Sequence, residues 1–194
     1  MAEKRKGSWI QTVTGRQFWP MDAKPEEVDI LDIAHSLSML CRFNGHCNRF
    51  YSVAEHAVHV SHVVGPEHAR WGLLHDAAEA FLSDIPQPVK RELTVFHEIE
   101  EQLLNVIAER FGLPAGLPVE VKQADMLLLA TEKAALMGPE PAPWEGIPDP
   151  LVPSMIQGWS PDQARREFLA RFGELFEVTD APRVGMELDI SSAI

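Results

Sequence analysis

Hydrophobic residues recur every three or four positions along most of this chain, which is the period of an amphipathic helix. In the stretch "VDILDIAHSLSMLC" the apolar positions are Ile30, Ile33, Leu37, Leu40 and Cys41. Comparable stretches predict helices over about 28–41, 52–64, 67–82, 94–111, 119–137 and 160–176. We find no internal repeat and no strand pattern beyond short edge pieces. The pattern therefore predicts an all-α fold, a helical bundle.

Glycine and proline mark the segments that separate these helices. Residues 1–25 contain glycine, proline and aromatic residues, and they predict an irregular N-terminal arm. The pair Asn44-Gly45 is a turn signal, and we expect "SDIPQPVK" to be non-helical at its two prolines. Residues 139–153 hold six of the 15 prolines, so we predict an extended surface loop before the C-terminal helix.

Three helix ends carry capping signals. Ser52 and Glu55 have the spacing of a capping box, in which the hydroxyl and the carboxylate each satisfy a free backbone N–H. Ser160 is predicted as the N-cap of the last helix, with proline at the next position. Gly112 is a predicted C-cap.

Length and charge restrict the classes of function. With 194 residues and 45% hydrophobic content, the chain predicts one domain over 1–194 with one core. The net charge of −12 and the absence of a long basic run argue against nucleic acid as a partner. No apolar run approaches the roughly 20 residues needed to cross a bilayer, and no secretory signal is present, so we expect a cytoplasmic protein with no membrane partner. The two cysteines fit a reducing compartment.

Ionisable residues stand in helical segments where a buried helix would carry leucine or alanine. "LLHDAAEAFLSDIPQPVKREL" places His75 and Asp76 side by side, His56 lies in the preceding predicted helix, and Asp125 is a lone acid in "VKQADMLLLA". Buried polar groups need partners, so these four are expected to converge from three helices. Two imidazoles and two carboxylates suit one divalent ion such as Mn, Co, Ni, Zn or Fe, and suit Mg less well because Mg prefers oxygen.

The segments "SVAEH", "LLHDAAE", "SDIPQPVK" and "VKQAD" occur in the order that is typical of HD-domain metal-dependent phosphohydrolases. The chain resembles the small 5'-nucleotidase-like branch of that family over about residues 28–137. The resemblance implies an all-helical HD domain, a metal held by His56, His75, Asp76 and Asp125, and a nucleotide as small-molecule substrate. It also implies a homo-oligomer, which relatives often form.

Two further acids are candidates for catalysis. A metal-activated water needs a carboxylate to orient it or to accept its proton. Glu79 follows Asp76 by one helical turn, and the following loop is expected to bring Asp84 back toward these two acids. The resemblance places both near the attacking water or the leaving oxygen. The alternatives are a glutamate on a helix surface and an aspartate that forms a turn.

Cations near these motifs could contact phosphate, and they are Arg42, Arg49, Lys90 and Lys122. Arg42-Phe43 stands where related nucleotidases have an arginine followed by an aromatic residue, the first for phosphate and the second for stacking. The ring here is phenylalanine where the resemblance predicts tryptophan, which leaves base and sugar selectivity open. Trp19 in the arm is expected either to be buried as an anchor or to offer a stacking surface.

Other polar residues favour structural roles. His59 and His62 continue the face of His56 and could line the pocket, although histidines at such positions are more often satisfied by neighbouring groups. The residues His35, His46, Cys41 and Cys47 lack the short spacing of structural zinc sites.

The sequence thus predicts a metal-dependent phosphohydrolase that acts on nucleoside 5'-monophosphates or removes phosphates from nucleoside triphosphates. Two alternatives belong to other classes: a nucleotide-binding regulatory module that does not turn over, and a structural helical bundle. The complete ligand set and Glu79 argue against the first, and the acid at Asp125 argues against the second.

Overall fold

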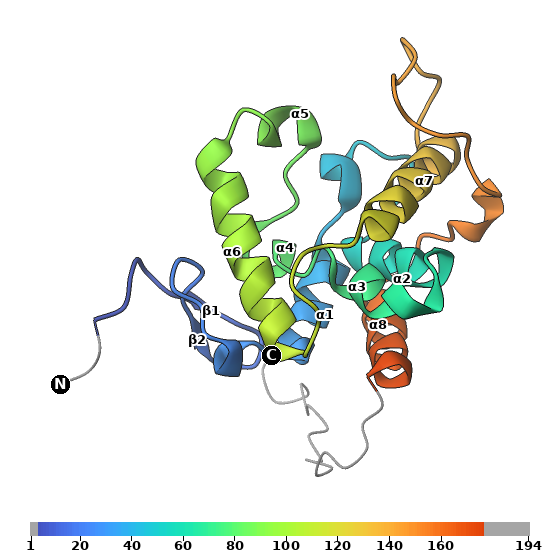
Figure 1. Cartoon of the computed structure of the whole chain (residues 1–194). Coiled ribbons are helices and arrows are strands. Elements are labelled where there is room, and N and C mark those ends of the chain that lie inside the picture. The colour runs from blue at the N-terminus through green and yellow to red at the C-terminus, as the bar shows by residue number, and fades with distance from the viewer. Residues whose placement is uncertain (1–3, 177–194) are drawn as a thin grey trace, which may run out of the picture.

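The computed structural model describes residues 4–176, and the ends of the predicted domain lie outside this range. Its regular structure is mostly helical, as predicted (Figure 1). The α-helices are α1 (Ile30–Met39), α2 (Val53–Val63), α3 (Ala69–Leu74), α4 (Glu79–Leu82), α5 (Gln87–Lys90), α6 (Thr94–Arg110), α7 (Val119–Leu136) and α8 (Pro161–Leu175). Short 3-10 helices are η1 (Pro25–Glu27), η2 (Arg42–Gly45), η3 (Pro66–His68) and η4 (Pro153–Met155).

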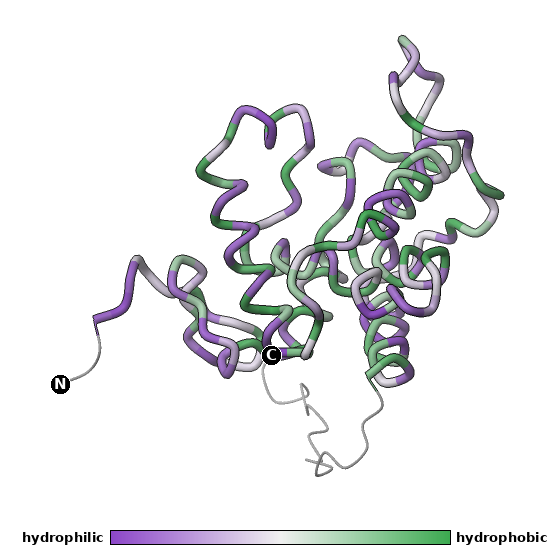
Figure 2. Tube along the Cα trace, viewed as in Figure 1, coloured by the Kyte–Doolittle hydropathy of each residue, from purple (hydrophilic) through white to green (hydrophobic). Residues whose placement is uncertain are grey.

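Helix α2 lies at the centre of the bundle and packs against α1, α3, α7 and α8. Every residue from Val53 to Ser61 is buried, so the His56 side chain starts from the interior of the protein. Helix α3 approaches α2 closely at Gly72, where an added Cβ would lie 2.9 Å from the Ser61 Cα. By contrast, the tube of α6 alternates between hydrophilic and hydrophobic stretches, as expected for a helix with one buried face (Figure 2).

The predicted helix over 67–82 is wrong in its middle, because the chain leaves the α-helix after Leu74 and resumes it at Glu79. The His75 Nδ1 donates to the Gly72 carbonyl oxygen at 2.8 Å, and this oxygen is one that a continuing α-helix would use for its own backbone. The next backbone bonds span three residues, from Ala77 to Leu74 and from Glu79 to Asp76. The tighter turn therefore sets the directions of His75 and Asp76.

The expectation that both prolines of "SDIPQPVK" are non-helical is also wrong for Pro88. Pro86 is the N-cap of α5, and Pro88 lies in its first turn. A proline there loses no hydrogen bond, because the first N–H groups of a helix have no partner within it. The segment Gln87–Lys90 is thus one ordered helical turn, and it packs against α6.

The N-terminal arm is more regular than predicted. Strands β1 (Ile10–Gln11) and β2 (Gln17–Phe18) form a two-stranded antiparallel sheet in which Ile10 pairs with Phe18 and Gln11 with Gln17. Phe18 is buried and stacks on Phe81 at 4.0 Å between ring centroids. Trp19 is only partly buried and lies under the Arg5 guanidinium, so Phe18 anchors the arm and the expectation of a buried Trp19 is wrong.

The predicted capping box at α2 is half present. The Ser52 Oγ accepts a hydrogen bond from the Glu55 N–H at 3.1 Å, as predicted. The buried Glu55 carboxylate instead accepts from the backbone N–H groups of Gln157, Gly158 and Trp159 at 3.0, 2.9 and 2.6 Å. Glu55 therefore fastens the segment after the Pro-rich loop to the central helix. The last helix begins as predicted, with Ser160 as its N-cap.

Candidate metal centre

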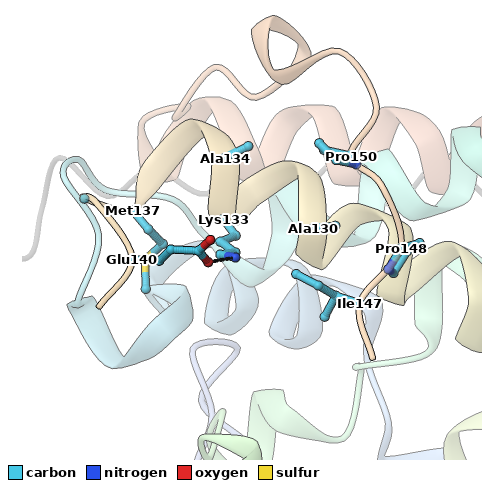
Figure 3. A pocket seen from close by; sticks show the side chains of 9 residues that line it. Ala130, Lys133, Ala134, Met137, Glu140, Ile147, Pro148 and Pro150 are labelled. Carbon is cyan, nitrogen blue, oxygen red and sulfur yellow. Dashed lines mark hydrogen bonds and ion pairs between the residues drawn. The ribbon is translucent and has the colours of Figure 1, made fainter. Parts of the chain in front are cut away.

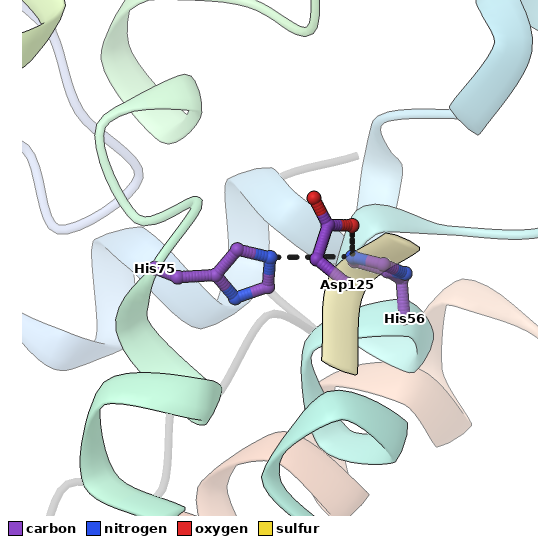
Figure 4. Close-up of side chains that lie close together, drawn as sticks. All are labelled: His56, His75 and Asp125. Atoms are coloured by element: carbon purple, nitrogen blue, oxygen red, sulfur yellow. Dashed lines mark hydrogen bonds and ion pairs between the residues drawn. The ribbon is translucent and has the colours of Figure 1, made fainter. Parts of the chain in front are cut away.

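Three elements bring two histidines and an aspartate together in the middle of the bundle. His56 comes from α2, His75 from the turn after α3, and Asp125 from α7, and their ligand atoms all lie within 4.8 Å of one another (Figure 4). The two Nε2 atoms are 3.3 Å apart, and the Asp125 Oδ1 lies 3.2 Å from the His56 Nε2. This cluster could hold a metal ion.

Asp76, the fourth predicted ligand, lies beside this cluster. Its Oδ2 is 3.1 Å from the His75 Nε2 and 3.6 Å from the His56 Nε2. The His56 side chain is 0% exposed, whereas those of Asp76 and Asp125 are 21% and 39% exposed. The imidazoles therefore form the floor of the centre, and the carboxylates form its solvent-facing side.

The second nitrogen of each imidazole ring already has a partner. The His56 Nδ1 lies 2.6 Å from the Glu132 Oε1, and the His75 Nδ1 lies 2.8 Å from the Gly72 carbonyl oxygen. Because both partners are acceptors, each Nδ1 carries a proton, and a ring that holds no second proton presents its Nε2 lone pair to the centre. Two such lone pairs cannot bond each other, but they are the donors that a divalent transition ion uses. The donor set thus fits the predicted metal.

The charges around the centre shift the pKa values of its members. Burial and Arg42 act to lower the pKa of His56, but Glu132 and Asp125 outweigh them and raise it to about 9. Burial opposes ionisation of Asp76, yet His75, His56 and Arg42 hold the pKa of Asp76 well below its usual range. Without metal, the centre therefore keeps a proton between His56 and its carboxylates at neutral pH.

Glu132 is a central residue that we did not predict from the sequence. Its side chain is completely buried on α7, where it accepts hydrogen bonds from the Tyr51 hydroxyl at 2.9 Å and from the Arg42 Nε at 3.1 Å, in addition to His56. Glu132 follows Asp125 by seven residues, or two helical turns, and so shares its face of α7. That spacing in an apolar stretch is the signal that could have found it.

Arg42, the predicted phosphate contact, lies within this network. Its side chain is 11% exposed, and its Nη1 is 3.7 Å from the Asp76 Oδ2. Phe43 lies beneath the guanidinium, with the Arg42 Cζ 5.6 Å from the ring centroid, and packs against the core. Arg42 thus neutralises carboxylates on two sides of the centre, while Phe43 supports it from below.

The two candidate catalytic acids have raised pKa values. Glu79 is 6% exposed at the start of α4, and its Oε2 has no hydrogen-bond partner among the described residues. Burial raises the pKa of Glu79 well above its usual value, and the charges of Asp76 and Asp84 raise it further. Burial also raises the pKa of Asp84, against the effect of Arg42. Both acids are therefore coupled electrostatically to the centre.

The two predicted lysines differ in their surroundings. The Lys90 Nζ on α5 forms an ion pair of 2.5 Å with the Glu100 Oε1. Burial acts to lower the pKa of Lys90, but Glu100, Glu79 and Asp76 outweigh it and raise that pKa. Lys122 is exposed on α7. Only Lys90 of this pair is thus tied to the charges of the centre.

The additional histidines lie outside the cluster. The His59 Nε2 is 3.6 Å from the Glu55 Oε1, and its ring lies 5.3 Å from that of Trp159. His62 is exposed. The buried His59 Nε2 has no hydrogen-bond partner among the described residues, so the expectation that His59 is satisfied by neighbouring groups is not met, and neither histidine joins the cluster.

Two cavities include none of the proposed ligands in their linings. One of about 290 Å³ lies between α7 and the Pro-rich loop, and the Lys133–Glu140 ion pair is part of its lining (Figure 3). Another of about 340 Å³ lies between α5 and α6 and is lined by Lys90 together with Gln87, Arg91, Thr94, His97 and Glu100. The second cavity therefore offers cationic groups on the side of Lys90.

Comparison with known proteins gives two relatives of similar length. The uncharacterized protein YfdR of Escherichia coli (strain K12) is 41% identical over 174 residues, which are 88% of this chain and 97% of YfdR. An uncharacterized protein of Rhodobacter capsulatus is 32% identical over 188 residues, which are 86% of this chain and 94% of the relative. No family model matches the chain. Among the described residues, none of the helices is long and apolar enough to cross a membrane.

Proposed function

This chain belongs to the family of the Escherichia coli protein YfdR, and from its cluster of imidazoles and carboxylates we propose that it is an HD-domain metal-dependent phosphohydrolase that acts on nucleotides. One observation carries the proposal. Two imidazole Nε2 atoms, 3.3 Å apart, face each other beside two carboxylates, and both outer ring nitrogens are held by acceptors. A purely structural bundle has no need of such a convergence of lone pairs and negative charge.

His56, His75, Asp76 and Asp125 would hold the ion. When bound, a divalent ion neutralises phosphate charge and lowers the pKa of water, which supplies a nucleophile near neutral pH. Glu132 holds the His56 ring by its Nδ1 so that the Nε2 is directed into the centre, and the Gly72 carbonyl does the same for His75. The protein thus sets the direction of both imidazoles before any ligand arrives.

Glu79 is proposed as the proton acceptor. A carboxylate with a raised pKa is a stronger base than an exposed glutamate, and the free Oε2 of Glu79 has no competing hydrogen bond among the described residues. Asp84, whose pKa is also raised, is proposed to assist proton transfer on the same side. Arg42 and Lys90 would supply positive charge near the phosphate. Phe43, beneath the Arg42 guanidinium, and the exposed Lys122 are proposed as further substrate contacts.

A panel of nucleoside mono-, di- and triphosphates, incubated with protein loaded with Mn, Co, Ni, Zn or Fe, tests the proposal. Chromatography of the products identifies the bond that breaks, since phosphate, pyrophosphate and tripolyphosphate come from different cleavages. We expect the parent protein to hydrolyse at least one nucleotide. We expect the Asp125→Ala variant to hydrolyse none of them with any of these metals. Tight nucleotide binding without product under every metal would contradict hydrolysis and favour a regulatory module.

A further inference from the structure

The two cysteines of the chain face each other across the loop that carries Arg42. The Cys41 and Cys47 Sγ atoms are 3.7 Å apart, and the Cys47 Sγ is also 4.0 Å from the Arg42 carbonyl oxygen. Both thiols are free and partly exposed. A small reagent can therefore reach a pair of thiols that are already near each other.

The ends of this loop are fastened to the bundle. Cys41 forms an isolated antiparallel bridge with Ser52, and the Arg42 N–H donates to the Tyr51 carbonyl oxygen at 2.9 Å. The Asn48 N–H donates to the Leu136 carbonyl oxygen at 2.9 Å. These bonds fix the backbone on both sides of the loop, and the fixed backbone keeps the two sulfurs close together.

The chain between the cysteines turns sharply. Phe43 and Asn44 have φ values of 56° and 52°, and Gly45 has a φ of 77°. A non-glycine residue in this left-handed region is uncommon, and two in succession keep the loop tight. The turn thus returns the chain after Arg42 to the neighbourhood of Cys41.

We propose that Cys41 and Cys47 are a modification site, at which a low-molecular-weight disulfide such as oxidised glutathione converts the two thiols into a reversible intramolecular disulfide that displaces Arg42 and slows the enzyme. The bridge itself stands on the sulfur geometry alone. Its effect on the rate rests on the proposed function.

The exchange needs only the two thiols and one molecule of the reagent. One cysteine thiolate attacks a sulfur of oxidised glutathione, forms a mixed disulfide and releases glutathione thiolate, which takes up the cysteine proton. The second cysteine then attacks the protein sulfur of the mixed disulfide and releases the second glutathione in the same way. Two protein thiols are oxidised, and one disulfide is reduced to two thiols.

The link to the metal centre is Arg42, the neighbour of Cys41. Bridging brings the sulfurs from 3.7 Å to about 2.05 Å, so the loop must move by a fraction of that change at each end. The Arg42 Nε lies 3.1 Å from the Glu132 Oε2 and its Nη1 lies 3.7 Å from the Asp76 Oδ2. A displacement on the order of 1 Å at such a site can slow a reaction by about 100-fold. We therefore expect the bridged form to turn over about 10- to 100-fold more slowly.

The test treats the full-length, metal-loaded protein with oxidised glutathione and counts thiols after denaturation. The bridge predicts a loss of both thiols, an intact mass lower by two hydrogen atoms, a monomer on a non-reducing gel and a peptide that links Cys41 to Cys47. Dithiothreitol should restore the thiols and the rate. Two stable adducts with glutathione, or two unchanged thiols, would overturn the modification site.

Cys47→Ser is the matched control, because it removes the bridge and leaves Arg42 in place. We expect it to hydrolyse nucleotide like the reduced parent and to keep its rate in oxidised glutathione. A bridged parent with an unchanged rate would overturn the effect on the enzyme. If the bridge forms and neither the reduced nor the bridged protein hydrolyses any nucleotide, the proposed function fails while the modification site stands.

Discussion

We predict that Glu79 and the proposed metal ligands have separable roles at the scale of single residues. Glu79 lies on α4 without a hydrogen-bond partner on its Oε2 among the described residues, and the ligand atoms of the cluster belong to other side chains. Glu79→Gln keeps the size of the side chain and removes its basicity. We predict a fall in kcat of about 10²- to 10⁴-fold with metal content unchanged. Steady-state kinetics beside elemental analysis check this, and loss of the metal would show that Glu79 is a ligand or supports one.

Glu132 orients His56, so replacing Glu132 should weaken metal binding. Glu132→Gln keeps an acceptor for the His56 Nδ1–H but removes the negative charge that faces His56 and Arg42. We predict that the affinity for the ion falls by about 10- to 100-fold, measured by calorimetry. Glu109→Gln, at an exposed position of α6, is the control and should bind metal like the parent. Equal affinities in both variants would remove Glu132 from the centre.

The proton held by His56 predicts how metal binding depends on pH. Its pKa is raised to about 9, so below that pH the metal-free protein must release the proton before the His56 Nε2 can bind an ion. Release of one proton makes the apparent affinity rise about tenfold per pH unit up to pH about 9 and level off above it. Calorimetry in buffers of different ionisation enthalpy counts the protons. A pH-independent affinity between pH 6 and 9 would contradict this account of His56.

The sequence pointed to four residues of the centre because each is an ionisable group in an apolar helical stretch. Glu132 was missed for a physical reason, since "ATEKAAL" also reads as a helix end with exposed charges. Its burial follows from the partners that the segment between α1 and α2 brings to it, among them Arg42 and Tyr51. Those contacts span about 80 to 90 residues, so the only local trace of Glu132 is its two-turn spacing from Asp125.

At the scale of elements, helical periodicity placed the long helices well. The observed α6 and α7, Thr94–Arg110 and Val119–Leu136, each end within one residue of the prediction. The break after α3 was missed, because it comes from a side chain, His75, that takes a carbonyl from the helix backbone. Periodicity records which face is buried and contains no information on such a competing bond.

The close packing of α3 on α2 gives a prediction for two helical glycines. An added Cβ at Gly72 would lie 2.9 Å from the Ser61 Cα, whereas at Gly173 in α8 nothing lies within 4 Å. Gly72→Ala should cost about 1–3 kcal/mol of stability by overpacking. Gly173→Ala should add about 0.5–1 kcal/mol, because alanine loses less backbone entropy in a helix. Thermal unfolding checks both, and equal shifts of Tm would contradict the close approach.

At the scale of the whole molecule, the helical bundle places two buried imidazoles beside two carboxylates that are partly exposed to solvent. The central helix supplies His56, the break after α3 supplies His75 and Asp76, and α7 supplies Asp125 with Glu132 two turns later. The net charge of −12 is compatible with the proposed phosphate binding, since Arg42 and Lys90 supply positive charge beside the acids of the centre. The proposed hydrolysis therefore depends on one ion bound at this centre.

Stepwise return of a divalent ion to metal-stripped protein tests this claim most directly, with bound metal and nucleotide hydrolysis measured on the same samples. The account predicts that the rate rises in proportion to bound metal and stops rising at one ion per chain, and that Asp125→Ala shows neither saturable binding nor turnover. An ion bound at one per chain with no hydrolysis of any nucleotide would contradict it, as would hydrolysis by the metal-stripped protein.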